Sequence, residues 1–362
     1  MYNFYRACPE AFDKKPNESE LTCRFQHGPE ISFKSGKNYQ DLRIETLDGV
    51  VIDEYRQQPP ELWTMVIRPM LSAKQGWASI LSTPNGFDHF KDLYDFALEH
   101  EDEWGAFQAP STEAPWWTPA EVASAKALMS EDEFAQEILA DFREMGAGKA
   151  YKNHGTWNHA TTNPFCSSQT YSPHLPIVVG LDFNVGLMCW VLGQCRAGQS
   201  YWADEIAVKN TNTEECAHVL VDKVKGHKSG VILIGDASGN ANKTSAVGKT
   251  DYSIITKVLK DNNISYKNLT PESNPHVKDR VNCVNGRLKS ADGKVHLWYN
   301  PQKCKYLKRD LERVKWKEGT SGAIFDKTDP LATHASDAFG YPVAYYSELL
   351  KKEVGVLAVR SA

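Results

Sequence analysis

Apolar and polar positions along residues 21–142 alternate in a way that predicts strands and helices in turn. Short runs rich in β-branched and aromatic residues favour strands, and apolar residues three or four positions apart favour helices. Strands are predicted at 21–25, 30–35, 49–53 and 78–83, and helices at 60–71, 90–100, 121–129 and 133–142. Capping boxes at Thr118–Glu121 and Ser130–Glu133 mark the starts of the last two helices. This alternation is typical of an α/β layer with a parallel sheet.

The pattern changes after residue 142. Residues 143–172 are rich in Gly, Asn, Ser and Thr and have no apolar period, which indicates a linker, and we place it at 151–172. Strands are predicted at 176–183, 187–195 and 200–208, and the turns between them are too short for a crossover, so we expect an antiparallel meander. Helices and strands then alternate up to a final helix at about 333–351. Three antiparallel strands followed by βα units is the order of a ribonuclease H-like domain.

The composition is that of an ordinary folded protein. The 362 residues are enough for two domains, with 41% hydrophobic and 24% charged residues. No apolar run approaches the roughly 18 residues of a membrane span, and the first residues lack the pattern of a signal peptide. The 8 cysteines are scattered without a CxxC pair, which predicts reduced thiols rather than disulfides or a zinc site. The net charge of −5 does not by itself favour nucleic-acid binding.

Two adjacent acids, Asp53 and Glu54, follow the apolar run 50–52. A buried strand that ends in a carboxylate pair is how many nucleotide hydrolases hold Mg²⁺ and place a water beside the γ-phosphate. Such a pair needs a P-loop, GxxxxGK[ST], to hold the phosphates. The nearest match, SAVGKT at 245–250, has Lys243 where the first glycine is required, and it lies downstream of the acids. The segments SGKN and GAGKA also fail, so we expect no P-loop in this chain.

Three aspartates in the second half have the chemistry of a metal-dependent nuclease site. Asp182 lies on the first strand of the meander, where an acid is costly unless it is paired or bound to a metal. Asp236 ends the strand expected to lie beside the first one. Asp337 lies in the final helix, with His334 on the same face. Hydrolysis of a phosphodiester by two Mg²⁺ ions needs such carboxylates from separate elements.

Each of these side chains also has an ordinary structural interpretation. Asp182 can be a hydrogen-bonded residue at a strand end, Asp236 a turn residue, and Asp337 a first-turn acid that complements the helix dipole. His334 is more often a residue of a helix start than a proton shuttle, so it is an auxiliary candidate. Glu205, on the third strand, is a weaker candidate for an outer ligand. The three aspartates together and in this order favour metal binding.

The segment 303–317 is strongly basic, with only Asp310 and Glu312 as acids. The candidate DNA-binding residues in it are Lys303, Lys305, Lys308, Arg309, Arg313 and Lys315. A solvated helix face is the ordinary interpretation of such a run. Beside a nuclease site the run becomes a phosphate-binding surface. Lys278 and Arg280 are expected to add to that surface.

Several segments, taken together and in order, resemble the large terminase subunit of tailed bacteriophages. GPEISFKSGKNYQDLRIETLDGVVIDEY resembles the part of the terminase ATPase domain that leads into its Walker B strand, and SILSTPNG resembles the coupling motif that follows. FAQEILADF resembles the helix that closes that domain. VVGLDFNVG, LIGDASGN, VKDRVNCVNGRL and THASDAFGYPVAY resemble successive segments of the terminase nuclease domain. The resemblance covers about residues 21–347, without the Walker A part that precedes this region in the family.

The resemblance implies an α/β fold in two domains. These are a partial P-loop-type ATPase domain at 1–150 and a ribonuclease H-like nuclease domain at 173–350, with a linker at 151–172 and a tail at 351–362. The implied substrate is concatemeric double-stranded DNA, cut during genome packaging. The implied partners are the phage portal protein and the small terminase subunit. The implied location is the host cytoplasm, at the procapsid portal, with no membrane contact.

The resemblance also implies roles for individual residues. Asp53 would hold Mg²⁺ and Glu54 would activate water. Ser82 and Thr83 would sense the γ-phosphate. The three aspartates described above would hold two Mg²⁺ or Mn²⁺ ions of an endonuclease. Because the P-loop is missing, ATP is not expected to bind this chain alone, and the ATPase half is expected to be incomplete.

Two other classes of function stay open at this stage. A non-catalytic terminase remnant or assembly module would account for the missing P-loop but not for the three aspartates. Another ribonuclease H-like enzyme, such as a transposase or junction resolvase, would share the fold. It would leave VVIDEYRQ, STPNG and the closing helix without an explanation.

Overall fold

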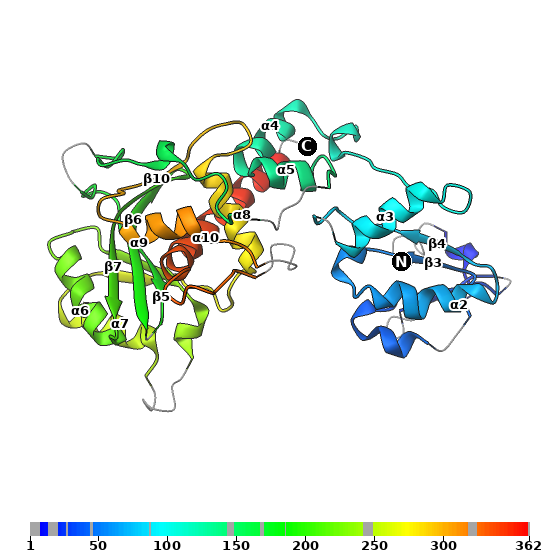
Figure 1. The fold of residues 1–362 in the computed structure, drawn as a ribbon, viewed down its shortest axis with the longest axis horizontal. Helices are drawn as coiled ribbons and strands as arrows, with labels where there is room; N and C mark the ends of the chain where they lie inside the picture. Colours follow the sequence, from blue (N-terminus) through cyan, green and yellow to red (C-terminus); the bar gives the residue numbers. More distant parts are fainter. Residues whose placement is uncertain are drawn as a thin grey trace. The chain divides into compact units, whose positions relative to one another are not determined.

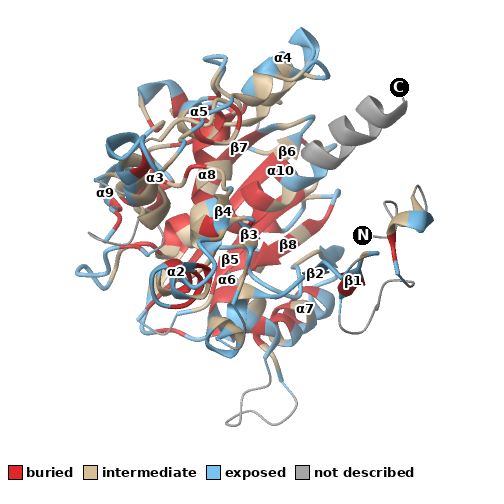
Figure 2. Ribbon diagram, turned by 90° about the vertical axis from the view of Figure 1, so that its right-hand side faces the viewer, coloured by how far each residue is buried: buried red, intermediate tan, exposed pale blue. Residues whose placement is uncertain are grey.

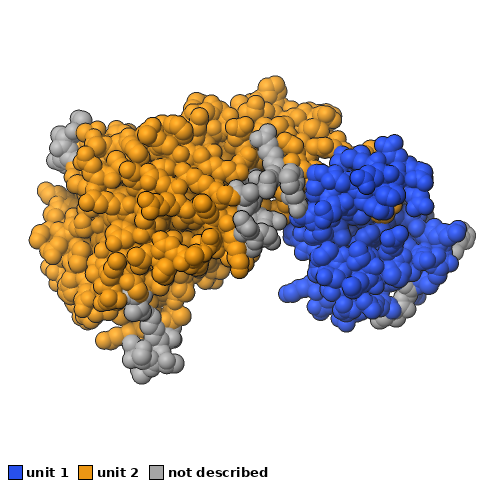
Figure 3. All heavy atoms as spheres, viewed as in Figure 1, with its two compact units in different colours: residues 1–83, 88–103 blue, residues 84–87, 104–362 orange. Residues whose placement is uncertain are grey.

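The computed structural model describes most of the chain, which forms two compact units. Described are residues 8–13, 21–26, 28–43, 46–86, 88–142, 148–166, 170–184, 186–241, 249–317 and 324–360, with 351–360 as backbone alone. Unit 1 comprises Met1–Thr83 and Asp88–Glu103, and unit 2 comprises Pro84–Phe87 and Trp104–Ala362 (Figure 3). The two P-loop-like segments at 146–150 and 245–250 fall partly outside the described residues.

Unit 1 is built on two small sheets (Figure 1). β1 (Thr22–Arg24) pairs antiparallel with β2 (Glu30–Ser32), and β3 (Gly49–Ile52) pairs parallel with β4 (Trp77–Ile80). Its helical elements are η1 (Pro9–Ala11), η2 (Gly36–Leu42), η3 (Tyr55–Gln57), the π-helical η4 (Leu62–Ile67), α2 (Arg68–Ser72) and α3 (His89–Glu99). The strand–helix–strand connection between β3 and β4 confirms the predicted α/β layer with a parallel pair.

The helices predicted from capping boxes begin where expected. α4 (Pro119–Leu128) follows Thr118, whose amide donates to the Glu121 carboxylate at 2.8 Å while its hydroxyl accepts the Glu121 amide at 3.3 Å. α5 (Glu131–Glu137) follows Ser130, whose hydroxyl accepts the amide of Glu133 at 3.1 Å. These contacts satisfy amides that have no partner within the helix. α5 ends earlier than the predicted 133–142.

The core of unit 2 is a six-stranded mixed sheet in the order β10-β7-β6-β5-β8-β9. The strands are β5 (Ile177–Asp182), β6 (Leu187–Arg196), β7 (Gln199–Lys209), β8 (Val231–Gly235), β9 (Tyr266–Asn268) and β10 (Leu297–Tyr299). β5, β6 and β7 run antiparallel in sequence order, as their short turns predict. β8 lies parallel beside β5, β9 beside β8, and β10 beside β7. The predicted ribonuclease H-like order is therefore confirmed.

Helices cover both faces of this sheet (Figure 1). α6 (Thr213–Val224) and α7 (Asp251–Asp261) lie on one face, and α8 (Val277–Leu288), α9 (Lys305–Arg313) and α10 (His334–Arg360) lie on the other. Ile177, Val179 and Leu181 of β5 enter the core under α6 and α7, whereas Val178 enters the other core. Because strand side chains alternate between faces, Asp182 falls on the α10 side. Many of the buried residues lie in these strands and in α10 (Figure 2).

Gly180 allows α10 to lie directly on β5. A Cβ atom at this position would clash with the carbonyl oxygen of Ala338 on α10. The absence of a side chain therefore permits a close backbone approach that any other residue would prevent. As a result, the first turns of α10 lie next to the carboxyl end of β5.

Part of the predicted linker packs on the core of unit 2. Tyr151 is 1% exposed, and Asn158, in η6 (Thr156–Asn158), is 0% exposed. The side-chain amide of Asn158 donates to the carbonyls of Leu288 at 2.8 Å and Leu297 at 2.9 Å. The use of 151–172 as a domain boundary stays a prediction. The backbone of α10 continues to Arg360, past the predicted end near 351. Within the described residues, no helix has the length and apolar character that crossing a membrane requires.

Candidate functional site

Asp182 and Asp236 end neighbouring parallel strands. In the register of β5 and β8, Leu181 pairs with Gly235, so the two acids follow in step at the carboxyl edge of the sheet. The amide of Asp236 donates to the carbonyl of Leu181 at 3.0 Å. Asp182 is 6% exposed. The structure thus brings together the two acids that the predicted strand order placed side by side.

Asp236 also organises the turn that follows β8. Its Oδ1 accepts the amide of Ser238 at 2.7 Å, at the start of η7 (Ala237–Asn240), and the side-chain amide of Asn274 at 2.8 Å. This is the turn role that the sequence also allowed for this residue. One carboxylate oxygen is therefore engaged within the protein.

Asp337 lies in the first turn of α10 and forms an ion pair with Arg280 of α8. The Arg280 side chain is 4% exposed, and its guanidinium lies 4.4 Å from the centre of the Tyr341 ring. Gly340 makes room for it, since a Cβ there would lie 2.9 Å from the Arg280 Cδ. The expectation that Arg280 faces DNA is therefore wrong, because a buried side chain paired with a carboxylate cannot reach a phosphate backbone.

The electrostatics of Asp337 tie it to Asp182. Burial raises the pKa of Asp337 to about 6; Arg280 opposes this shift, and the negative charge of Asp182 adds to it. The charge of Asp182 acts on Asp337, so the two carboxylates lie near each other, where a shared cation would stabilise both. Asp337 thus lies near the first of the two strand-end acids, and we refer to the three aspartates as the cluster.

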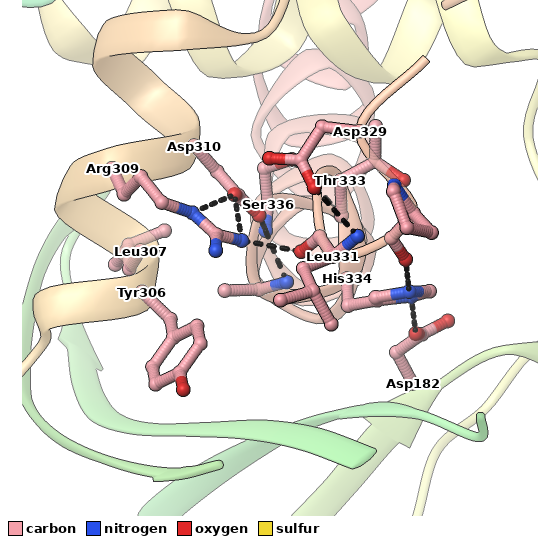
Figure 4. Close-up of polar contacts among 12 residues, drawn as sticks. Asp182, Tyr306, Leu307, Arg309, Asp310, Asp329, Leu331, Thr333, His334 and Ser336 are labelled. Carbon is pink, nitrogen blue, oxygen red and sulfur yellow. Dashed lines mark hydrogen bonds and ion pairs between the residues drawn. The ribbon is translucent and has the colours of Figure 1, made fainter. Parts of the chain in front are cut away.

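His334 begins α10 and faces Asp182 (Figure 4). Its Nδ1 lies 3.1 Å from Asp182 Oδ2 and its Nε2 lies 3.1 Å from the carbonyl oxygen of Pro330. The hydrogen bond with Asp182 raises the pKa of His334, because acceptors at the ring nitrogens favour the imidazolium form. Asn184 Nδ2 also lies 3.1 Å from Nδ1. The auxiliary candidate is thus joined to the first of the three acids.

The donor chemistry of this cluster fits a divalent cation such as Mg²⁺, which prefers a few carboxylates and several waters. In the arrangement seen, Asp337 is paired with Arg280 and one oxygen of Asp236 caps a turn. Accordingly, no three His, Cys, Asp or Glu side chains of the described residues stand together as a metal site.

Glu205 has a structural task at the start of α9. Its two oxygens accept the amides of Tyr306 at 2.8 Å and Leu307 at 3.0 Å. Burial raises the pKa of Glu205, while these amides oppose the shift. Its neighbour Asp204 pairs with Lys223 at 2.7 Å. The role of Glu205 as an outer metal ligand stays a prediction.

The basic segment forms α9 and the residues around it. Its apolar positions, among them Leu307 and Leu311, are buried in the core. Four of the candidate DNA-binding residues are exposed: Lys303, Lys305, Arg313 and Lys315. Lys308 is half-buried and lies 3.8 Å from Glu312. Arg309 is also half-buried and donates to Asp310 and to the carbonyl of Leu331.

In unit 1, the acid pair and the coupling motif meet at the ends of β3 and β4. The amide of Tyr55 donates to the carbonyl of Leu81 at 3.1 Å, and the Ser82 hydroxyl accepts the amide of Arg56 at 3.1 Å. Glu54 has a left-handed backbone, with φ of 50°. The Asp53 carboxylate accepts the amide of Glu54 at 3.0 Å. The fold therefore places residues 53–54 beside residues 82–83.

Comparisons with known proteins point to one family. No protein-family model matches the sequence. The large terminase subunits of Thermus phage G20c and Thermus virus P23-45 are each 40% identical over 65 residues. That match covers 18% of this chain and only 13% of either relative. The large terminase of a thermophilic bacteriophage is similar in structure, with a TM-score of 0.62 at 14% identity, over 96% of this chain and 81% of the other.

The chain has the fold of a phage large terminase. The match to the structure from the thermophilic phage extends through both units, and the sequence match to the Thermus phage proteins supports the same resemblance. Because the sequence match covers so little of the curated relatives, their activity, substrates and partners enter only as a proposal for this terminase-like chain.

Two residues near the acids were missed or misplaced by sequence reasoning. Arg280 binds Asp337, and Asp310 accepts two amides at the start of α10. Each lies on the apolar stripe of its helix; Arg280, for example, lies between the partly buried Val277 and the buried Val284. A charged residue on such a stripe is the signal that it has a buried partner.

Proposed function

We propose that this terminase-like chain is a metal-dependent endonuclease that cuts concatemeric double-stranded DNA during phage genome packaging. The observation that carries the proposal is the cluster at the carboxyl edge of the sheet. Asp182 and Asp236 end adjacent strands there, and Asp337 comes from the helix that lies on Gly180. Open α/β sheets usually bind their ligands at the carboxyl ends of the parallel strands.

Each residue of the cluster has a distinct proposed task. Asp182, Asp236 and Asp337 would hold the metal ions, and Mg²⁺ or Mn²⁺ suits their oxygen ligands. When bound, two such ions supply the positive charge that polarises the phosphodiester and lowers the pKa of the attacking water. His334 would hold a proton at Nδ1 against Asp182. Before a metal ion binds, Arg280 would keep the Asp337 carboxylate in place.

The DNA-binding surface would consist of the exposed cations around α9. Lys303, Lys305, Arg313 and Lys315 can contact the phosphate backbone without reading its sequence. Lys308 would add a weaker contact. Neutralising each phosphate releases counterions, so binding should fall steeply as salt concentration rises.

The ATPase half would be incomplete in this chain. Asp53, Glu54, Ser82 and Thr83 are placed together, but no GxxxxGK[ST] segment exists in the sequence. Most of the affinity for a triphosphate comes from contacts with the backbone amides and the lysine of that loop. We therefore propose that this chain alone does not hydrolyse ATP. The division into domains at 1–150 and 173–350, and the portal protein and small terminase subunit as partners, belong to the same proposal.

A plasmid-cutting assay tests the proposal. The chain should nick or linearise supercoiled plasmid with Mn²⁺ or Mg²⁺, with little sequence preference, and EDTA should stop the cutting. Asp182→Asn, Asp236→Asn and Asp337→Asn should each abolish it. Asp222→Asn is the matched control, since Asp222 is exposed on α6 and pairs only with Lys225 in the interactions described for it. Cutting that survives all three substitutions would place the site elsewhere, and a complete lack of cutting would favour a non-catalytic terminase remnant.

A further inference from the structure

The carboxylate of Asp310 lies between α9 and the start of α10. Asp310 is 0% exposed, and its Oδ2 accepts the amides of Ala335 at 3.0 Å and Ser336 at 3.1 Å (Figure 4). The first amides of a helix have no partner within the helix. Here a neighbouring helix supplies the acceptor that a capping residue of α10 itself would normally provide. Asp310 therefore fixes where α10 begins.

Arg309 holds the chain on the other side of that start. Its guanidinium donates to Asp310 Oδ1, at 3.0 Å from Nη2, and also to the carbonyl of Leu331. The guanidinium lies 5.0 Å from the centre of the Tyr306 ring. One arginine–aspartate pair thus contacts the chain both before and after residue 333.

Thr333, between the two contacts, has an unfavourable backbone conformation. Its φ is 76°, although it is β-branched and 1% exposed. Such a residue in the left-handed region is an outlier that persists only where the surroundings fix it. Its carbonyl accepts the amide of Asp337 at 2.7 Å and the Ser336 hydroxyl at 3.0 Å. The conformation of Thr333 therefore sets the first turn that carries His334 and Asp337.

Glu205 extends this arrangement back to the sheet. Because it accepts the amides of Tyr306 and Leu307, β7 fixes the start of α9 just as α9 fixes the start of α10. The half-buried carboxylate of Glu205 and the buried carboxylate of Asp310 thus connect the central sheet to the helix that bears His334. Glu205 lies in β7 and Asp310 lies in α9, so each caps a helix other than its own element.

We propose that Arg309 and Asp310 form a positioning pair for the nuclease site: they hold Thr333 in its left-handed conformation and so place His334 against Asp182. The catalytic consequence rests on the proposed nuclease function, whereas the placement of His334 does not. In this role Arg309 acts inside the protein and is not a contact to DNA. The pair touches neither DNA nor the reacting atoms, so its residues are positioning residues.

Substitutions at these positions separate positioning from DNA contact. Asp310→Asn keeps the size of the side chain but loses charge and one acceptor oxygen. Arg309→Lys keeps the positive charge but loses the planar fork that spans Asp310 and Leu331. Both should lower the kcat of plasmid cutting about 10- to 100-fold, as a misplaced group does, with KM for DNA unchanged. The exposed Lys305→Gln is the contrasting control and should raise KM with kcat unchanged.

A second substitution, Thr333→Gly, and the magnetic resonance signals of the His334 ring distinguish positioning from simple loss of stability. Thr333→Gly removes the penalty of positive φ, so it should restore a large part of kcat in the Asp310→Asn background. In metal-free protein with labelled histidines, the ring signals of His334, identified by their loss in His334→Gln, should shift in Asp310→Asn and return toward the parent values in the double variant. If Asp310→Asn does not fold, Arg309→Lys with and without Thr333→Gly decides by the same measurements.

The outcomes also separate this inference from the proposed function. A parent protein that cuts no DNA would refute the nuclease proposal, while the His334 signals would still test the positioning pair. Unshifted His334 signals in Asp310→Asn and Arg309→Lys would overturn the inference, as would a rise in KM for Arg309→Lys with kcat retained.

Discussion

Burial of Asp337 should give the protein a pH-dependent loss of stability. The pKa of this carboxyl is raised from 3.8 to about 6 by burial, with Arg280 opposing and Asp182 adding to the shift. The folded state therefore binds this proton more tightly than the unfolded chain does. As pH rises from 3.8 through about 6, the free energy of unfolding falls. Above that range Asp337 is ionised and the full loss of stability is reached. The difference between 3.8 and about 6 corresponds to about 3 kcal/mol.

Asp337→Asn removes this titration and leaves the rest of the cluster. We expect the unfolding free energy of the variant, minus that of the parent, to rise by about 2 kcal/mol between about pH 4 and about pH 7 in buffer with EDTA. Arg280 keeps its charge throughout, so the loss of its partner adds an offset that does not change with pH. Urea unfolding followed by circular dichroism, at several pH values for both proteins, gives the difference.

A difference that is constant with pH, or that changes in the opposite direction, would contradict a raised pKa of Asp337. Asp222→Asn is the control, because it replaces an exposed aspartate that pairs with Lys225 and leaves Asp337 unchanged. A pH-dependent difference of the same size in the control would mean that the titration comes from elsewhere in the protein.

Three further predictions concern Gly180, His334 and nucleotide binding. Gly180→Ala should destabilise the protein by about 1–3 kcal/mol and lower DNA cutting, because its Cβ would displace α10; thermal unfolding and the plasmid assay measure both effects. His334→Gln should destabilise most below the unfolded pKa of 6.5 and least above the raised folded pKa, since the imidazolium's hydrogen bond with Asp182 is lost as pH rises; an equal loss at acidic and alkaline pH would contradict this. Calorimetry with Mg-ATP should detect no tight binding, and a micromolar dissociation constant would mean that a phosphate cradle exists outside the P-loop pattern.

The sequence predicts those features that a local signal or a strand order determines. Thr118 and Ser130 mark helix starts because their hydroxyls satisfy nearby amides, and that requirement depends on only a few residues. Short turns between the strands at 176–208 leave only an antiparallel meander. Once β8 lies beside β5, Asp182 and Asp236 must end at the same edge.

The features that the sequence did not predict depend on partners far apart in the chain. Arg280 was assigned to a DNA-binding surface because it is a cation near other cations, but its partner Asp337 lies on another helix. Arg309 was assigned to the same surface. Its contact with the carbonyl of Leu331, 22 residues away, leaves no pattern in the sequence. The positive φ of Thr333 has no signal at all, because a β-branched residue is the last one expected there.

Whether Asp182 belongs to the metal-dependent cutting site is tested by the single-turnover rate of Mn²⁺-dependent plasmid cutting. The rate is measured for the parent, Asp182→Asn and Asp222→Asn at equal protein concentration. Asp182 is the buried acid that joins the strand edge to His334, so its replacement should remove cutting, while the exposed control should keep the parent rate. Circular dichroism should confirm that all three proteins are folded. Equal rates for the parent and Asp182→Asn, both abolished by EDTA, would contradict the account, because the metal ion would then act at another site.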